Sequence, residues 1–246
     1  MKNIFQYAQF KVKHSGVSSF KALIFAVAFV SSAALSASAG AAESEGTFVV
    51  IIGAPGSGKS TVSDYLRSSE GVPIIEVGQL LAAKIEEASR STARGRPGSQ
   101  RTRSASRRNR NIERARDQLE AGELVEGQAL DAVVAAAVLA PDATGGFILD
   151  GYPGTWTQAE FLDGLLDARG IVPTVLYLDI TDELALERME GRGRADDLSG
   201  FDETRLEIFR NNIAPLLEFY EGSDMYTIDA SQSIAEVRAQ VDELLD

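Results

Sequence analysis

One short segment of the chain carries the residue types that bind phosphate: Gly53-Ala54-Pro55-Gly56-Ser57-Gly58-Lys59-Ser60. It matches the phosphate-loop pattern G-x-x-x-x-G-K-[ST]. The glycines let the backbone turn so that consecutive N–H groups point at phosphate oxygens, and the helix that follows adds a positive dipole. Lys59 can then reach the β- and γ-phosphates of a nucleoside triphosphate, and the Ser60 hydroxyl can ligate Mg²⁺.

The elements around this loop come in the order that the chemistry requires. Residues 47–52 are a short β-branched apolar run, typical of a buried parallel strand, and Val62, Tyr65 and Leu66 recur at helical spacing after the loop. Further apolar runs predict four more strands, at 72–77, 147–149, 174–178 and 225–228. Because helical patterns separate them, we expect βαβ units and a three-layer α/β/α fold with a five-stranded parallel sheet.

The composition excludes several kinds of chemistry. The chain has 246 residues, a formal net charge of −12 and no cysteine, which excludes disulfides, thiolate nucleophiles and zinc–sulfur sites. Its one histidine, His14, lies in a segment that we expect to be removed. Catalysis would therefore use carboxylates, lysine, arginine, hydroxyls, backbone amides and a hard metal ion. The net charge argues for solubility and against general affinity for nucleic acid.

The first 42 residues have the pattern of a secretory leader. Four lysines precede the uncharged, largely apolar run Ala22 to Leu35, and Ala37-Ser38-Ala39 has the form of a signal-peptidase site. We expect residues 1–42 to be removed and the exported chain, periplasmic or secreted, to comprise residues 43–246. An uncleaved membrane anchor, an organellar leader and a misassigned start codon upstream of a cytosolic enzyme remain alternatives.

A second unusual segment, Ser89 to Asn111, is rich in arginine, serine and glycine. No acidic residue occurs between Ala88 and Ile112, whereas eight arginines occur from Arg90 to Arg110. Because it has almost no apolar residues, we expect an exposed insertion between two helices, a solvated linker. A contact for phosphate or nucleic acid and a localisation or processing signal are the alternatives.

Several motifs in the right order resemble those of the adenylate kinase family of nucleoside monophosphate kinases. The resemblance covers nearly all of Phe48 to Leu245, apart from the arginine-rich insertion. Beyond the phosphate loop, the matching segments are 147–153 with 158–160, 175–179, 187–188, 193–197, 205–206, 214–216 and 228–230.

The resemblance implies a role for each matching residue. The ATP site would comprise Gly53, Ala54, Pro55, Gly56, Ser57, Gly58, Lys59, Ser60, Thr61 and Arg188. The residues that stabilise the transferring phosphoryl group would be Lys59, Arg192, Arg194 and Arg205, because fixed positive charge suits a spread-out anion. The acceptor would contact Gly78, Gly151, Gln158, Arg194 and Arg205, and Mg²⁺ would be held by Ser60 and Asp150.

The resemblance also implies a P-loop NTPase fold with two moving parts. These are a small lid at about 188–201 and an acceptor-binding arm at about 77–134, which contains the insertion 89–111. Their closure would exclude water from the phosphoryl group. The implied reaction is ATP + AMP ⇌ 2 ADP in a monomer that uses Mg²⁺ and binds no nucleic acid. A kinase for a metabolite hydroxyl is the rival enzyme, which the motifs disfavour.

Three departures from the family pattern fall on the acceptor site. Gly154 and Ala82 stand where the family has arginines that grip the acceptor phosphate, and Val77 replaces a threonine. One charge-assisted contact is typically worth about 1.5–3 kcal/mol. Three interpretations follow: insertion arginines such as Arg107, Arg108 or Arg110 replace the missing pair, the acceptor is a different nucleotide, or the protein binds ATP with little transfer activity.

Overall fold

The computed structural model describes residues 46–94, 103–120, 123, 125, 127–191 and 201–245. The predicted leader lies outside these residues, so its cleavage and the export of the chain stay predictions. In the described part of the chain, no helix combines the length and apolar character needed to cross a membrane.

A five-stranded parallel sheet forms the centre of the molecule, as the sequence predicts. The strands are β1 (Thr47–Gly53), β2 (Ile74–Glu76), β3 (Gly146–Asp150), β4 (Thr174–Asp179) and β5 (Met225–Asp229). They are arranged in the order β2-β3-β1-β4-β5, with every pair parallel. The carboxyl ends of all five strands therefore meet at one edge, where ligands bind in open α/β sheets.

The central strand β1 is buried on both faces because its side chains alternate. Val49 and Ile51 join the apolar cluster on one side of the sheet, whereas Phe48, Val50 and Ile52 join the cluster on the other. All five are at least 95% buried. A strand that is apolar at every position can lie only in the middle of a sheet with helices on both sides, and this makes the layered fold predictable.

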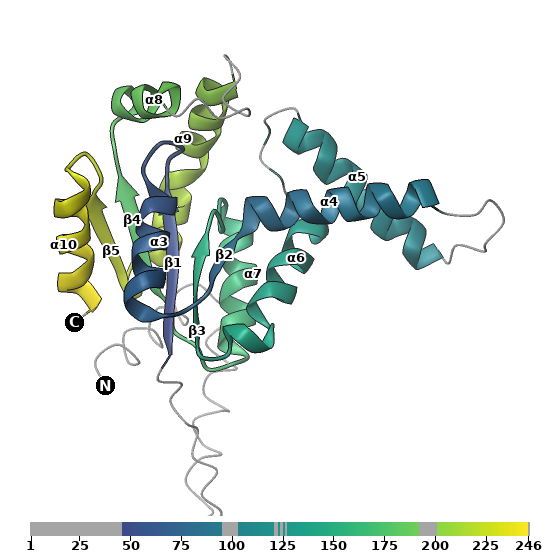
Figure 1. Cartoon of the computed structure of the whole chain (residues 1–246), viewed down its shortest axis with the longest axis horizontal. Helices are drawn as coiled ribbons and strands as arrows, with labels where there is room; N and C mark the ends of the chain where they lie inside the picture. The colour runs from purple at the N-terminus through teal and green to yellow at the C-terminus, as the bar shows by residue number, and fades with distance from the viewer. Residues whose placement is uncertain are drawn as a thin grey trace, which may run out of the picture.

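Helices cover both faces of the sheet (Figure 1). The helix α3 (Lys59–Glu70) and the last helix, α10 (Ile234–Leu245), pack on one face through Val62, Leu66, Val237 and Val241. The other face is covered by α6 (Gln128–Val138), α7 (Trp156–Asp167) and α9 (Phe201–Tyr220). The short helix α8 (Asp182–Glu190) follows β4, and the 3₁₀ turn η1 (Pro141–Ala143) precedes β3.

Two helices project sideways from the sheet and form the feature that we call the arm (Figure 1). These are α4 (Val77–Arg94) and α5 (Arg103–Glu120), which pack against each other and against α6. We expected residues 89–111 to form a linker between two helices. In the structure, α4 continues to Arg94 and α5 begins at Arg103. The predicted linker is therefore helical over all of its described residues.

Two local interactions explain why a segment without apolar residues is helical. The Arg116 guanidinium on α5 donates a hydrogen bond of 2.7 Å to the Ser89 hydroxyl on α4, and Ser89 donates to the carbonyl of Ile85. Ile85 and Ala115 are buried in the same apolar cluster. The two helices are therefore fixed to each other near the core, and they extend outwards through residues of good helical propensity such as alanine and arginine.

The second strand is shorter than the sequence predicts. The run 72–77 reads as one strand, but β2 covers only Ile74–Glu76, and Val77 begins α4. Val77 is 2% exposed and packs in the same cluster as Leu81 and Ile85, which follow it at helical spacing. Tertiary burial of this helical face overrides the β propensity of valine.

We expect a core leucine and an exposed leucine to differ sharply in their effect on stability. Leu176 on β4 is 0% exposed, so Leu176→Ala should lower the free energy of unfolding by about 2–5 kcal/mol, through lost burial and the cavity left behind. Leu139 is 53% exposed, so Leu139→Ala should change it by less than about 0.5 kcal/mol. Urea denaturation of both variants measures the difference, and equal effects would contradict the assigned core.

Candidate active site

The phosphate loop lies at the carboxyl end of the central strand. β1 ends at Gly53, the loop follows, and α3 begins at Lys59. Gly58 caps α3 with φ 92°, a left-handed conformation that glycine adopts without strain. The Ser57 N–H donates to the carbonyl of Ala54 at 3.1 Å, which closes the turn. The amino end of α3 therefore faces the ligand edge of the sheet.

Lys59 lies across the loop that it follows. Its ammonium donates hydrogen bonds of 2.9 Å to the carbonyls of both Gly53 and Ala54. These contacts hold a positive charge over the turn where consecutive N–H groups cradle phosphate oxygens. The position agrees with the predicted role of Lys59 toward the phosphates of a nucleotide.

Two further features describe the loop: one buried hydroxyl lacks a hydrogen-bond partner, and Gly56 leaves no space for a side chain. The Ser57 hydroxyl is buried and has no hydrogen-bond partner among the described residues, so a bound phosphate oxygen would be a natural partner. Gly56 has φ 81°, and a Cβ atom there would lie 2.4 Å from the carbonyl oxygen of Ala185 on α8. The loop is thus fitted between α3 and α8.

A carboxylate stands beside the loop at the end of β3. Asp150 is 7% exposed, and its Oδ2 atom lies 3.2 Å from the Ser63 hydroxyl on α3. The same hydroxyl lies 3.0 Å from the carbonyl of Lys59, so it can donate to only one of the two at a time. Asp150 and Ser60 supply the hard oxygen ligands that Mg²⁺ prefers. Among the described residues no cluster of three potential metal-ligating side chains occurs.

The donor side of the site is completed by residues after β4 and β5. Arg188, near the end of α8, donates a hydrogen bond of 2.8 Å to the carbonyl of Ala230, which follows β5. Arg210 on α9 donates to Asp182 and to the carbonyl of Ile180, and so ties α9 to the start of α8. Arg188 therefore lies at the same sheet edge as the phosphate loop, where the sequence places it for adenine.

Two tyrosines near the site have pKa values raised by their surroundings. Burial, together with a hydrogen bond to Asp179, raises the pKa of Tyr177 to about 12. Burial and the neighbouring Asp131 carboxylate raise the pKa of Tyr152 well above its usual value, and its hydroxyl donates to Asp131 at 3.0 Å. Both act as hydrogen-bond donors at neutral pH, and Tyr152 connects the loop after β3 to α6.

The predicted acceptor residues lie on the other half of the same edge. Gly151 has φ 84° directly after β3, and Gly78 is the second residue of α4, directly after β2. Glu76 and Asp150, the last residues of these two neighbouring strands, are paired in register. The structure thus gathers Gly78 and Gly151 beside two carboxylates and next to the phosphate loop.

Gln158 has a structural contact that the sequence does not reveal. It is 5% exposed, its Oε1 atom accepts a hydrogen bond of 2.7 Å from the Gly154 N–H, and its Nε2 donates to the carbonyl of Val125 at 3.1 Å. In this structure the Gln158 amide therefore joins the loop after β3 to the segment that returns from the arm. Reading an acceptor base would require at least one of these bonds to be exchanged.

The arginines of the arm lie too far out to replace those missing at positions 82 and 154. Ser89 lies 12 residues after Val77, which corresponds to about 18 Å along α4. Arg116 reaches Ser89, and the candidates Arg107, Arg108 and Arg110 lie closer to the distal end, where α5 begins (Figure 1). If the arm rotated about its base, the distance between these arginines and the base of α4 would not change. The replacement hypothesis is therefore disfavoured.

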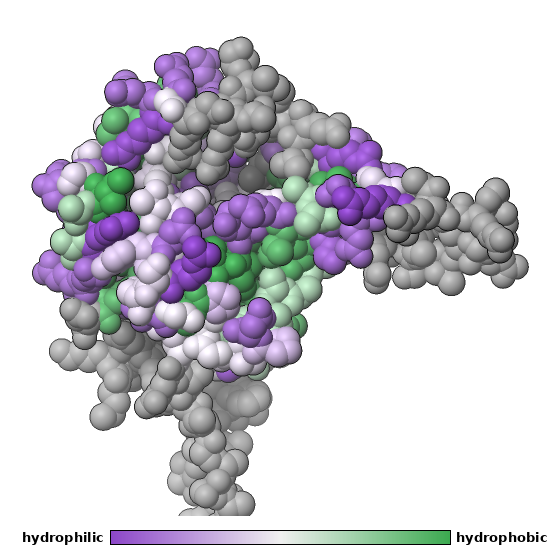
Figure 2. All heavy atoms as spheres, in the orientation of Figure 1, coloured by the Kyte–Doolittle hydropathy of each residue, from purple (hydrophilic) through white to green (hydrophobic). Residues whose placement is uncertain are grey.

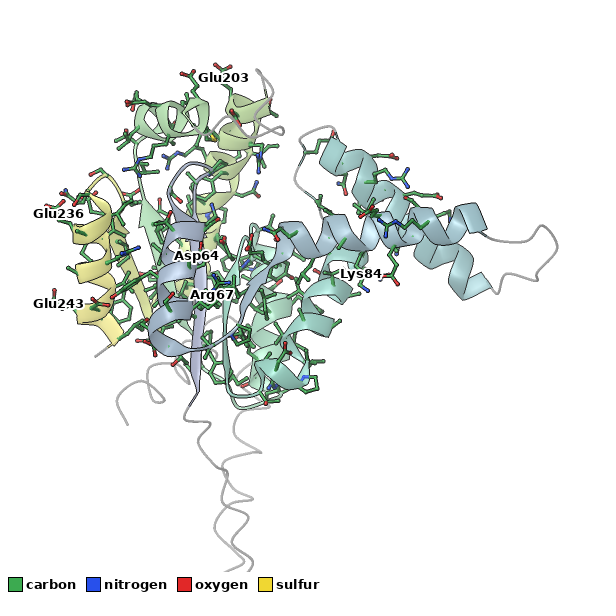
Figure 3. All side chains as sticks on the ribbon, viewed as in Figure 1. Asp64, Arg67, Lys84, Glu203, Glu236 and Glu243 are labelled. Atoms are coloured by element: carbon green, nitrogen blue, oxygen red, sulfur yellow. The ribbon has the colours of Figure 1, made fainter. Side chains whose placement is uncertain are left out.

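The predicted lid arginines are only partly described. Arg192 and Arg194 lie within residues 192–200, outside the described part of the chain. Arg205 is exposed on α9, in the second turn after Phe201. Figure 3 labels the neighbouring Glu203 at the end of α9 that stands beside α8. Arg205, two residues further along α9, lies on the same part of this helix.

Comparisons with known proteins show the family of the chain. A protein-family model described as an AAA domain matches residues 52–203. The adenylate kinase of Mycobacteroides abscessus is 35% identical over 198 residues, which cover 80% of this chain and 98% of that protein. The chain belongs to the adenylate kinase family.

Two further relatives agree. The adenylate kinase of Rhodococcus erythropolis is 35% identical over 193 residues, or 78% of this chain and 95% of that protein. The adenylate kinase of Leuconostoc mesenteroides is 32% identical over 200 residues, or 80% and 96%. The family recognised from the motifs is confirmed, and the chain is a phosphotransferase of the nucleoside monophosphate kinase class.

The sequence pointed to the phosphate loop, Asp150 and Arg188, which the structure brings to one edge of the sheet, but it did not point to the residues that contact them. Ser63 orients Asp150, and its position four residues after Lys59 is a signal that could have been used, because it places both on one face of α3. The carboxylate of Glu76 beside the acceptor site could also have been noticed. The contact of Gln158 with Val125 joins residues 33 apart in sequence and carries no local signal.

We expect the closeness of Gly56 to α8 to be essential for nucleotide binding in this adenylate kinase family member. Gly56→Ala forces a Cβ against the Ala185 carbonyl at positive φ, a strain of about 1–3 kcal/mol that the loop must relieve by moving. ATP affinity, measured by calorimetry, should fall at least about tenfold. Gly164→Ala on α7, where nothing lies within 4 Å, is the matched control and should leave affinity unchanged. Equal affinities for both variants would contradict this account.

Proposed function

We propose that the protein transfers the γ-phosphoryl group of Mg·ATP to AMP. The observation that carries the proposal is the phosphate loop with Lys59 across it, between an intact strand and helix, in a chain of the adenylate kinase family. The relatives named above are adenylate kinases, and this supports AMP as the first acceptor to test. Phosphoryl transfer needs positioning and fixed positive charge more than covalent chemistry.

The donor half supports this reaction residue by residue. The loop amides and Lys59 would hold the β- and γ-phosphates, and the unpartnered Ser57 hydroxyl would gain a hydrogen-bond partner. Arg188 would lie along the adenine ring, since its guanidinium is already held beside the end of β5. Arg205, on the flank beside α8, would approach the transferring phosphoryl group when the site closes.

The residues present also suit Mg²⁺. Ser60 begins the helix at the phosphate loop, and Asp150 is a buried carboxylate held by Ser63. Mg²⁺ is usually held by one or two protein oxygens together with phosphate oxygens and water, so this sparse set is sufficient. When bound, the ion would neutralise charge on the phosphates. Asp150 would hold it indirectly, through water.

A second candidate is supported by the acceptor side. Ala82 is exposed on α4 and Gly154 has no side chain, so neither position supplies a charge to an acceptor phosphate. Glu76 and Asp150 add negative charge to the same edge. The alternatives are therefore a kinase for another nucleoside monophosphate and an ATP-binding protein with little transfer activity. In both, the donor half works as described.

The proposal is tested by turnover with a panel of acceptors. Residues 43–246 should phosphorylate AMP in the presence of Mg·ATP, and Lys59→Ala should abolish turnover because the loop loses the ammonium group held over it. A coupled assay with AMP, CMP, UMP, GMP and dAMP measures both. Turnover on a different monophosphate would change the acceptor. Tight ATP binding without turnover on any acceptor would refute the kinase in favour of the binding protein.

Restoring one missing arginine should strengthen acceptor binding. Ala82→Arg returns the family's charge to the exposed first turns of α4, and one charge-assisted contact of about 1.5–3 kcal/mol should lower the KM for AMP at least about tenfold. Ala83→Arg adds the same charge at the next exposed position, roughly 100° around the helix, and should have little effect. If the two variants had the same KM, the acceptor phosphate would not lie beside position 82.

A further inference from the structure

The arm carries a concentration of positive charge that the proposed function does not use. The eight arginines from Arg90 to Arg110 contribute +8, so the remainder of the chain carries −20 against a total of −12. Glu236 and Glu243 on α10, which Figure 3 labels, lie on the opposite side of the molecule from the arm, although the arm itself also carries Glu86, Glu87, Glu113, Asp117 and Glu120. The net charge of the whole chain therefore hides a strongly basic region.

Part of the basic region lies on the helix α5, which packs on α4 and α6. Arg110 and Arg114 are both exposed on α5, and the side facing α4 and α6 is occupied instead by Ala115 and Ile112. Arginine recurs along α5 at 103, 107, 110 and 114, and spacings of four, three and four residues place these positions on one face of the helix. The row is about 16 Å long and points away from the sheet with the arm.

The chemistry of the region selects the kind of partner. Apart from Pro97, residues 88–111 include no apolar residue larger than alanine, so nothing is available to fill a protein pocket or to enter a bilayer. All eight basic residues are arginine, whose fork suits phosphate oxygens, and serine, threonine and asparagine supply further hydrogen-bond donors. We propose that the face of α5 on which positions 103, 107, 110 and 114 lie binds the phosphodiester backbone of a nucleic acid without reading its sequence.

A linear polyanion fits this surface better than a flat one does. A flat anionic membrane would gain only electrostatic attraction, because residues 88–111 offer no large apolar side chain to insert. A single nucleic-acid strand can follow the row and avoid the acidic body of the molecule. Repulsion from the body is weak at the distal end of the arm, because that end lies about 27 Å from the base of α4 and the Debye length is about 8 Å.

Binding of labelled DNA tests the proposal on the intact chain 43–246. A single strand of about 20 nucleotides in mixed sequence should bind, with affinity falling at least tenfold between about 50 and 200 mM salt. Arg110→Gln/Arg114→Gln should reduce the slope of log affinity against log salt by about 1.4, since each lost phosphate contact removes about 0.7. Fluorescence anisotropy measures both quantities.

A control variant distinguishes binding at this surface from a general effect of lowering the positive charge of the protein. Arg67→Gln/Arg238→Gln removes the same charge from exposed positions on α3 and α10 and should leave the slope unchanged. The arm variant should keep the thermal stability and AMP turnover of the unaltered chain. The proposal is overturned if DNA does not bind at about 50 mM salt or if both double variants lose the same slope. Stronger binding to phosphatidylserine vesicles than to DNA would also overturn it and assign the surface to a membrane.

Discussion

The phosphate loop can exist only because the strand before it is buried on both faces. β1 lies in the middle of the sheet, and its carboxyl end opens between α3 and α8, where no side chain can intrude at Gly56. The other residues of the site lie around the carboxyl end of β1. Lys59 folds back over the loop, Asp150 ends the neighbouring strand β3, and Arg188 is held at the end of β5.

The two halves of the active site are built on different supports. The donor half rests on the sheet and on helices that pack directly against it, so its groups are held by buried contacts. The acceptor half rests partly on the arm, which meets the sheet only at the short strand β2. Positions 82 and 154, where the family resemblance implies arginines, hold alanine and glycine, and both lie on the acceptor half.

The helices of the arm fix how far its distal end lies from the sheet. An unbroken helix of 18 residues separates its distal end from the sheet, which disfavours a role in phosphoryl transfer for the charge at that end. The surface of the arm is mainly hydrophilic where its side chains are described, in contrast to the apolar strip beneath it (Figure 2). A surface of this kind is free to evolve a separate interaction while the catalytic edge remains unchanged.

The sequence alone determined the layered fold, the strand that carries the phosphate loop and the family to which the chain belongs. These features depend on short-range patterns: apolar runs such as 47–52, glycines at fixed spacing and a lysine at the start of a helix. Only the tertiary structure decided where β2 ends, because burial of Val77 with Leu81 and Ile85 makes that residue helical. Only the structure showed that residues 89–94 and 103–111 are helical, since their support comes from contacts such as Arg116 with Ser89 across the arm. The bonds of Gln158 to Gly154 and Val125 belong to the same class, because they depend on packing between distant segments that no local pattern records.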